Sequence, residues 1–194
     1  MKINIYKLAI TISALLVSQN IIAGTPTIFP TVNALFHNFQ DYSIEKGTFK
    51  ILKTKPLHIW VGSEETMFED PQFIEEDIKR SIVYGIYRSF IHTNVQEITV
   101  TSEAKLLKFD HKKPLSKEIN FMAQFKKTVS IKRDKALALI QKFSIANNFS
   151  DLVADWSYEG MIDHDQWSRP AKRTMYNDQG LPGLNIFFNE LIKP

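Results

Sequence analysis

The segment from Asp70 to about His92 restricts the fold of this chain more than any other stretch of its sequence. Asp70 followed by Pro71 is typical of a helix start, with the acid as N-cap and the proline in the first turn. Apolar residues then recur at a spacing of four, with others beside them: Ile74, Ile78, Ile82, Ile86 and Phe90, widened by Phe73, Tyr84, Tyr87 and Ile91. Small residues at the same spacing (Ser81, Gly85 and Ser89) predict close packing against another element. The pattern therefore predicts a long helix with one broad buried face.

Shorter segments on both sides of this helix have the two-residue period of strands. Residues 48–52 and 57–61 precede the helix, and residues 97–101 and 119–131 follow it. Further helices are expected at 32–39, 133–143, 150–158 and from 184 onward, with an irregular stretch over 161–183. This order predicts an α+β fold, a small antiparallel or mixed sheet with helices mainly on one face. Its middle, β-α-β-β-α, resembles the core of a ferredoxin-like fold.

The first 23 residues have the three-part layout of a secretory signal peptide. Residues 1–7 are basic, residues 8–17 are apolar or small, and the more polar segment after them ends at Ala23 and Gly24. The apolar run is shorter than the roughly 20 residues of a membrane-spanning helix. We therefore expect cleavage after Ala23 and a single globular domain over 24–194 in the periplasm, with no transmembrane segment. An uncleaved anchor is the alternative.

Composition excludes several classes of chemistry. The chain has no cysteine, so disulfides, thiol catalysis and thiolate metal sites are absent. Removal of Lys2 and Lys7 with the signal peptide would lower the formal charge from +3 to about +1, so nucleic acid is not an expected partner. The sequence contains no glycine-rich phosphate loop, nucleophile elbow, zinc-protease motif or calcium loop. We expect neither a cofactor nor a metal.

Charge and aromatic residues point to surface recognition. Seven acids and no base lie between residues 64 and 77, whereas ten bases and three acids lie between residues 105 and 135. Patches of opposite sign permit docking to a partner, although a solvated surface is the ordinary interpretation. His58 and Trp60 share one face of their strand and would present an aromatic surface if no helix covers them.

Candidate site residues gather in the C-terminal third: Trp156, Tyr158, Asp163, His164, Asp165, Trp167 and Tyr176. An imidazole between two carboxylates, as in Asp163-His164-Asp165, suits metal binding or proton transfer. The alternative is a polar loop whose carboxylates bond to nearby backbone. Aromatic rings interleaved with acids also suit a sugar, either bound or hydrolysed between two carboxylates. Against that, the tryptophans are interpretable as core residues.

We interpret the chain as a periplasmic accessory or binding protein that acts by protein–protein recognition, not as an enzyme. The expected partner is a protein of the cell envelope, either in the assembly of an envelope machine or as the target of an inhibitor or immunity-type protein. The alternative function is binding or hydrolysis of peptidoglycan or another glycan through the C-terminal aromatic and acidic residues. A metal-dependent hydrolase centred on His164 is the third interpretation.

Overall fold

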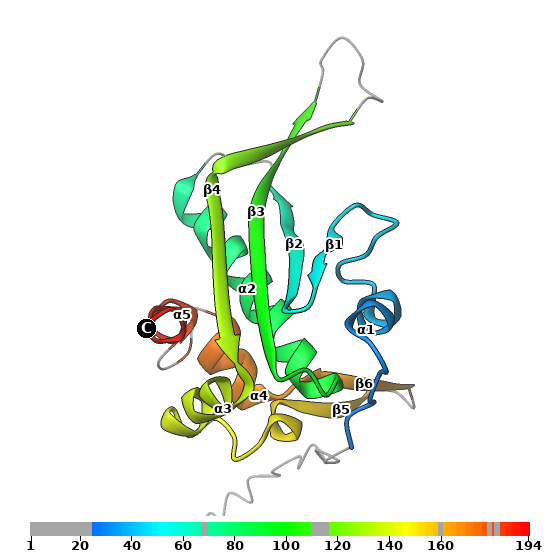
Figure 1. Ribbon diagram of the computed structural model, residues 1–194, viewed down its shortest axis with the longest axis vertical. Coiled ribbons are helices and arrows are strands. Elements are labelled where there is room, and N and C mark those ends of the chain that lie inside the picture. The colour runs from blue at the N-terminus through cyan, green and yellow to red at the C-terminus, as the bar shows by residue number, and fades with distance from the viewer. Residues whose placement is uncertain (1–24, 67–69, 110–116, 159–160, 178–179, 181–182) are drawn as a thin grey trace, which may run out of the picture.

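The computed structural model describes residues 25–66, 70–109, 117–158, 161–177, 180 and 183–194. The fold consists of a four-stranded sheet and a two-stranded sheet with helices around them. Figure 1 shows the larger sheet upright in the middle of the molecule and the smaller one at its lower end. The expected signal peptide, residues 1–23, lies outside the described residues.

Helix α2 (Pro71–His92) is the long helix that the sequence predicts. The Asp70 carboxylate accepts a hydrogen bond from the Gln72 N–H at 2.9 Å, which confirms the cap. Every residue from Ser81 to His92 is buried. Phe73 was expected on the buried face but is 56 % exposed, because it lies in the first turn, ahead of the continuously buried part of the helix. None of the described helices is both long and apolar enough to span a bilayer.

The larger sheet has the strand order β1 (Phe49–Thr54), β2 (Leu57–Thr66), β3 (Glu97–Phe109) and β4 (Lys117–Lys132). The pairs β1–β2 and β3–β4 are antiparallel, whereas β2 and β3 are parallel and are connected by α2. The sheet is therefore mixed, and the α+β prediction is confirmed. A ferredoxin-like core is not confirmed: its split βαβ unit places another strand between the two parallel ones, but β2 and β3 bond directly.

Gly85 marks the closest approach between α2 and the sheet. A Cβ atom added there would lie 3.0 Å from Val100 Cγ1 and 3.4 Å from Ile59 Cδ1. Ser81 and Ser89, one turn to either side, are fully buried. The stripe of small residues therefore lets the helix rest directly on β2 and β3, as the sequence predicts.

We expect Gly85→Val to lower the free energy of unfolding by about 2 kcal/mol, because the branched side chain overpacks against Val100. Gly85→Ala is the matched control. Its better helix propensity, about 1 kcal/mol, offsets the tight Cβ contact, so its stability should change little. Urea denaturation measures both variants, and a valine variant as stable as the parent would contradict the close approach.

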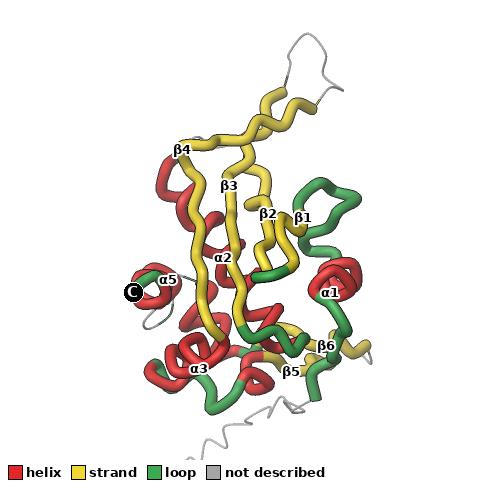
Figure 2. Tube along the Cα trace, viewed as in Figure 1, coloured by secondary structure: helices red, strands yellow, loops and turns green. Residues whose placement is uncertain are grey.

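The sheet face turned away from α2 carries polar side chains that bond across the strands. His58 Nε2 lies 2.8 Å from Thr101 Oγ1, which lies 2.7 Å from Thr128 Oγ1. In Figures 1 and 2, α2 lies on one side of the sheet and no described helix crosses the other. Trp60 is nevertheless only 6 % exposed, with the Lys50 ammonium 5.2 Å from its ring centroid. The aromatic surface expected at Trp60 is therefore not presented to solvent.

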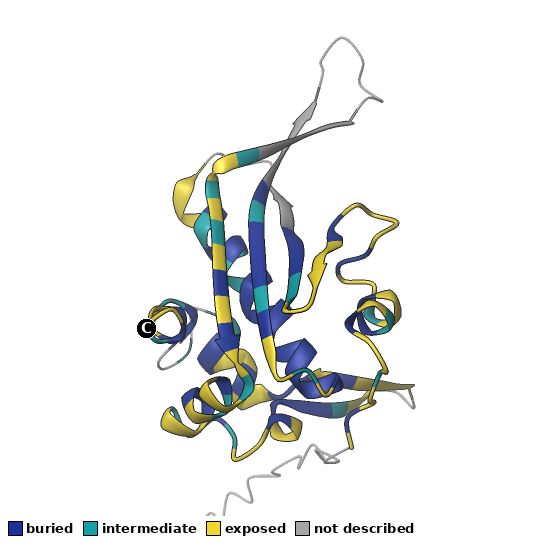
Figure 3. Ribbon diagram, viewed as in Figure 1, coloured by how far each residue is buried: buried dark blue, intermediate teal, exposed yellow. Residues whose placement is uncertain are grey.

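Three predicted helices are present: α1 (Val32–Phe39), α3 (Arg133–Lys142) and α5 (Gly183–Leu191). Thr31 caps α1 by accepting a hydrogen bond from the Ala34 N–H at 3.1 Å. The apolar faces of these helices join α2 in one core, shown dark blue in Figure 3. Because α1 and α5 lie on opposite sides of α2 in Figure 2, the core wraps around the long helix.

Residues 150–167 differ from the sequence-based expectation. The helix predicted over 150–158 is wrong, and so is the irregular assignment of the residues after 160. The chain forms a short 3₁₀ turn, η1 (Phe149–Leu152), and then a hairpin of β5 (Val153–Tyr158) and β6 (Met161–Trp167). Val153 and Ala154 are both buried, residues 161–164 are all exposed, and a bulge lies between Ala154 and Trp156. The two-residue period of strands is therefore not visible in the sequence. Short helical turns follow, α4 (Arg169–Ala171) and η2 (Lys172–Tyr176).

Candidate functional site

The β5–β6 hairpin is irregular where the sequence-predicted site lies. The pairing register shifts between Ala154 and Trp156, which creates a β-bulge. The Asp155 carboxylate holds this bulge together. It accepts one hydrogen bond from His164 Nδ1 at 3.0 Å and another from the Asp165 N–H at 3.1 Å. Two residues of the strongest local sequence pattern therefore stabilise an irregular hairpin.

Asp165 turns inward at the bulge. Its φ of 55° lies in the left-handed region, which Asp adopts more readily than most residues. The residue is 6 % exposed. Its carbonyl oxygen accepts a hydrogen bond from Arg88 Nη1 at 2.5 Å, and its carboxylate accepts one from the Thr27 N–H at 3.2 Å. The bulge thus joins the hairpin both to α2 and to the segment before α1.

Arg88 lies in the core beneath the hairpin and is 2 % exposed. Three aromatic rings surround its guanidinium, with centroids 4.6 Å away for Phe39, 5.5 Å for Tyr84 and 4.3 Å for Trp167. Cation–π attraction is strongest where the cation is desolvated, as it is here. Burial lowers the pKa of Arg88, but a guanidinium stays protonated in proteins. The hairpin therefore packs on a buried cation, through the Trp167 ring and the Asp165 carbonyl oxygen.

His92, one helical turn after Arg88, connects that cation to residues 25–30, which we call the N-terminal strap. Its Nδ1 lies 2.8 Å from the Thr27 carbonyl oxygen and its Nε2 lies 3.2 Å from Arg88 Nη1. Because a carbonyl and a guanidinium N–H face the two nitrogens, Nδ1 donates and Nε2 accepts, which requires a neutral ring. Burial, together with the charge of Arg88, lowers the pKa of His92 to about 4. We call Arg88, His92 and Asp165 the buried polar cluster.

A shallow hollow of about 160 Å³ lies beside the bulge. Its lining combines two indoles with polar groups: Trp156, Asp163, Gln166, Trp167 and Lys172. Trp156 is 39 % exposed, whereas Trp167 is 9 % exposed and packs on the core. The Arg169 guanidinium lies 5.7 Å from the Trp156 ring centroid. We call this site the Trp156 hollow.

The structure separates the seven predicted site residues into groups. Trp156, Asp163 and Trp167 line the Trp156 hollow, His164 and Asp165 bond to Asp155, and Tyr176 packs on Trp167 with centroids 5.6 Å apart. Tyr158 ends β5, and its side chain lies outside the described residues. Within the described ranges, no three His, Cys, Asp or Glu side chains are placed to share a metal ion. The hollow is therefore the place where predicted residues converge around open space.

Sequence reasoning missed the central members of the buried polar cluster, Arg88 and His92. A signal was present, because Tyr84, Arg88 and His92 follow one another at a spacing of four on a helix expected to be buried. A line of polar groups at that spacing on a buried helix indicates an internal network, since buried polar groups need partners.

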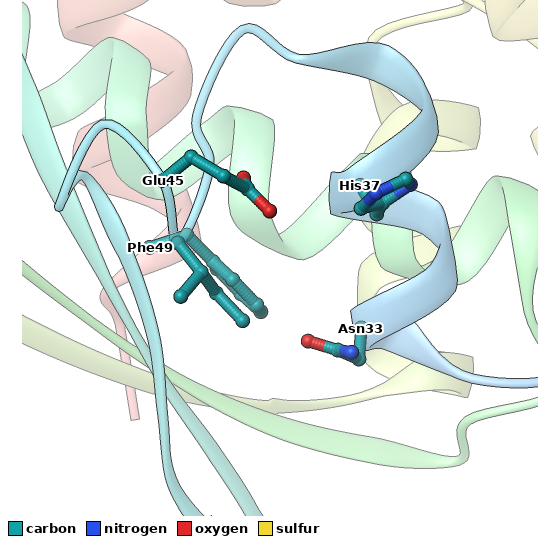
Figure 4. A pocket seen from close by; sticks show the side chains of 5 residues that line it. Asn33, His37, Glu45 and Phe49 are labelled. Carbon is teal, nitrogen blue, oxygen red and sulfur yellow. The ribbon is translucent and has the colours of Figure 1, made fainter.

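A second hollow, of about 100 Å³, lies between α1 and the loop that precedes β1. Asn33 and His37 extend into it from α1, and Glu45 and Phe49 form the opposite wall (Figure 4). The pKa of Glu45 is lowered by hydrogen bonds to backbone and to Ser43 within its own loop. The carboxylate of Glu45 therefore stabilises the loop conformation.

Neither a protein-family model, nor a curated protein, nor a solved structure matches this chain. Its function has to be inferred from the contacts and exposure of its own residues.

Proposed function

We propose that this protein is a periplasmic recognition protein that binds a protein partner through the end of its β5–β6 hairpin. The observation that carries the proposal is the exposure of two adjacent apolar side chains there, Met161 (67 % exposed) and Ile162 (50 % exposed). We call these two residues the hairpin tip. Methionine is enriched in protein interfaces and charged residues are depleted from their centres, so the tip has the composition of an interface core.

The anchoring of the hairpin supports this role. A two-stranded hairpin on its own is marginally stable, but this one is fastened to α2 through the Arg88–Asp165 hydrogen bond. Trp167, at its base, is buried against Tyr84 and Tyr176. A tip held in place before binding loses little conformational freedom when a partner docks.

The bonding of the ionisable groups favours recognition over catalysis. His164 Nδ1 donates to the Asp155 carboxylate across the bulge, and neither residue is among those that line the Trp156 hollow. His92 is fully buried, with both ring nitrogens engaged. The imidazoles of His164 and His92 therefore both have structural partners.

The periplasmic address in this proposal rests on the sequence of residues 1–23, which follow the basic, apolar and polar order of a signal peptide ending at Ala23. A crosslinking experiment in the native host therefore examines the localisation and the partner together.

A photo-crosslinking amino acid at position 162 tests the proposal. We expect a discrete adduct between the processed chain and one envelope protein, because Ile162 would lie inside the interface. A second substitution, Met161→Asp, should reduce the adduct at least about tenfold, the factor that corresponds to a loss of about 1.4 kcal/mol of binding free energy.

Ile186 on α5 provides the matched control, since it is an isoleucine of similar exposure, 52 % against 50 % for Ile162. The same photo-crosslinker at position 186 should give no such adduct. Equal adducts from the two positions, or none from position 162, would contradict recognition through the hairpin tip.

A further inference from the structure

The residues that line the Trp156 hollow have no role in the protein recognition proposed for the hairpin tip. Trp156 is the most exposed tryptophan of the three in the chain, at 39 % against 6 % for Trp60 and 9 % for Trp167. Three polar side chains stand around it, a carboxylate (Asp163), an amide (Gln166) and an ammonium (Lys172). The Arg169 guanidinium lies 5.7 Å from the Trp156 ring centroid, yet the ring keeps its exposure. An exposed indole beside both acceptors and donors suits a ligand with an apolar face and a polar edge.

We propose that the Trp156 hollow binds one pyranose ring of a glycan chain. The C–H face of a pyranose is apolar and packs on an aromatic ring, while its hydroxyl groups both donate and accept hydrogen bonds. Asp163 accepts from such hydroxyls, Lys172 donates to them, and Gln166 does both. The ligand class follows from this mixture of groups around a single exposed ring.

Other ligand classes fit the lining less well. A phenylalanine or proline side chain has no hydrogen-bond donor at its edge, so it would leave Asp163 desolvated without a partner. A tyrosine or tryptophan side chain carries a single donor group, too few for the three polar side chains of the lining. A phosphate would be attracted by the Lys172 ammonium but repelled by the Asp163 carboxylate in the same hollow. A neutral sugar satisfies the carboxylate without bringing a second negative charge.

The size of the hollow limits how much of the glycan is held. Its volume of about 160 Å³ lies below the roughly 300–1,000 Å³ of pockets that enclose a whole drug-sized ligand. One ring therefore fits, with the rest of the chain in solvent. A single stacked ring predicts weak binding, with a dissociation constant in the millimolar range.

This site is separate from the hairpin tip, so the sugar proposal does not depend on a protein partner. It also does not require hydrolysis. Among the described residues that line the hollow, Asp163 is the one carboxylate, whereas glycosidases commonly use two that flank the scissile bond. The site is therefore proposed for binding.

Saturation-transfer NMR with the purified protein tests the site, with chitotetraose and cellotetraose as probes. We expect transfer to the ring C–H protons of at least one tetramer at millimolar concentration. Trp156→Ala should weaken the apparent affinity at least about tenfold, and Trp156→Tyr should retain most of it. Tighter binding of chitotetraose would show that the site recognises the acetamido group, and equal binding of the two tetramers would show that it recognises the pyranose ring alone. Both results support the proposal.

Two controls make the result decisive. Ile162→Asp should leave sugar binding unchanged, because it alters the hairpin tip and not the hollow. A failure of the sugar proposal can therefore be told apart from a failure of the protein-partner proposal. Co-sedimentation with peptidoglycan separates a wall polymer from a free oligosaccharide as the source of the ring, and the site stands in either case. Absence of transfer to both tetramers, or an unchanged affinity in Trp156→Ala with an unchanged melting temperature, would overturn the proposal.

Discussion

Arg88→Ala is expected to lower the free energy of unfolding by about 3–5 kcal/mol, the usual cost of removing one partner from a buried charged network. The substitution leaves the Asp165 carbonyl and His92 Nε2 without their shared donor. It also empties the space between the rings of Phe39 and Trp167. A chain of this size should lose roughly 6–20 °C in melting temperature. Urea denaturation at pH 7 measures the effect.

Arg80→Ala is the matched control for this prediction, since it removes the same side chain from the same helix. Arg80 forms ion pairs with Glu76 at 3.1 Å and Asp77 at 3.0 Å, and its side chain is 30 % exposed. Arg80 Nε also donates to the Tyr176 carbonyl oxygen at 3.3 Å, and the Glu76 side chain is only 10 % exposed. We therefore expect a loss of about 1–2 kcal/mol, between that of an exposed ion pair and that of a buried one. If Arg88→Ala were no more destabilising than Arg80→Ala, the buried polar cluster would not hold the fold together.

Acidification should destabilise the protein between about pH 6.5 and pH 4, because His92 must stay neutral in the folded state. Burial lowers the pKa of His92 from its ordinary 6.5 to about 4, so the unfolded chain binds a proton in this window and the folded chain does not. Stability is therefore complete above pH 6.5 and falls as the pH decreases towards 4, by up to about 3 kcal/mol. The groups that face His92 are Arg88, Asp165 and the Thr27 carbonyl.

His92→Gln isolates this contribution from that of the carboxylates that titrate in the same range. The variant lacks the titrating ring, so its stability should fall less steeply than that of the parent between pH 6.5 and pH 4.5 in urea denaturation. NMR titration of the His92 ring in the parent gives a direct reading. A midpoint near 6.5, or identical slopes in the two proteins, would contradict a neutral buried imidazole.

The regular elements could be predicted because their signals are local. Asp70-Pro71 and the isoleucines of α2 determine a cap and a buried face within one segment. The small stripe around Gly85 predicted close packing without identifying Val100 and Ile59 as the neighbours. These features depend on spacing along the chain, which a single sequence displays directly.

The site was predicted only in part, because its contacts join segments far apart in the chain. Arg88 is 77 residues from Asp165, and His92 is 65 residues from Thr27. The sequence shows an aspartate beside His164, but the carboxylate that bonds to this ring comes from Asp155 on the other strand. The pairing of β5 with β6 brings it there, and the bulge conceals that pairing from a periodicity argument.

The buried polar cluster, with Arg88 and His92 on α2 and Asp165 on β6, fastens both the N-terminal strap and the β5–β6 hairpin. Amide hydrogen exchange of the Thr27 and Asp165 N–H groups in Arg88→Ala, under conditions where the variant is folded, tests it most directly. We expect both amides to lose protection together while the Phe188 N–H on α5 keeps its protection. Unchanged protection at Thr27 and Asp165 would contradict it.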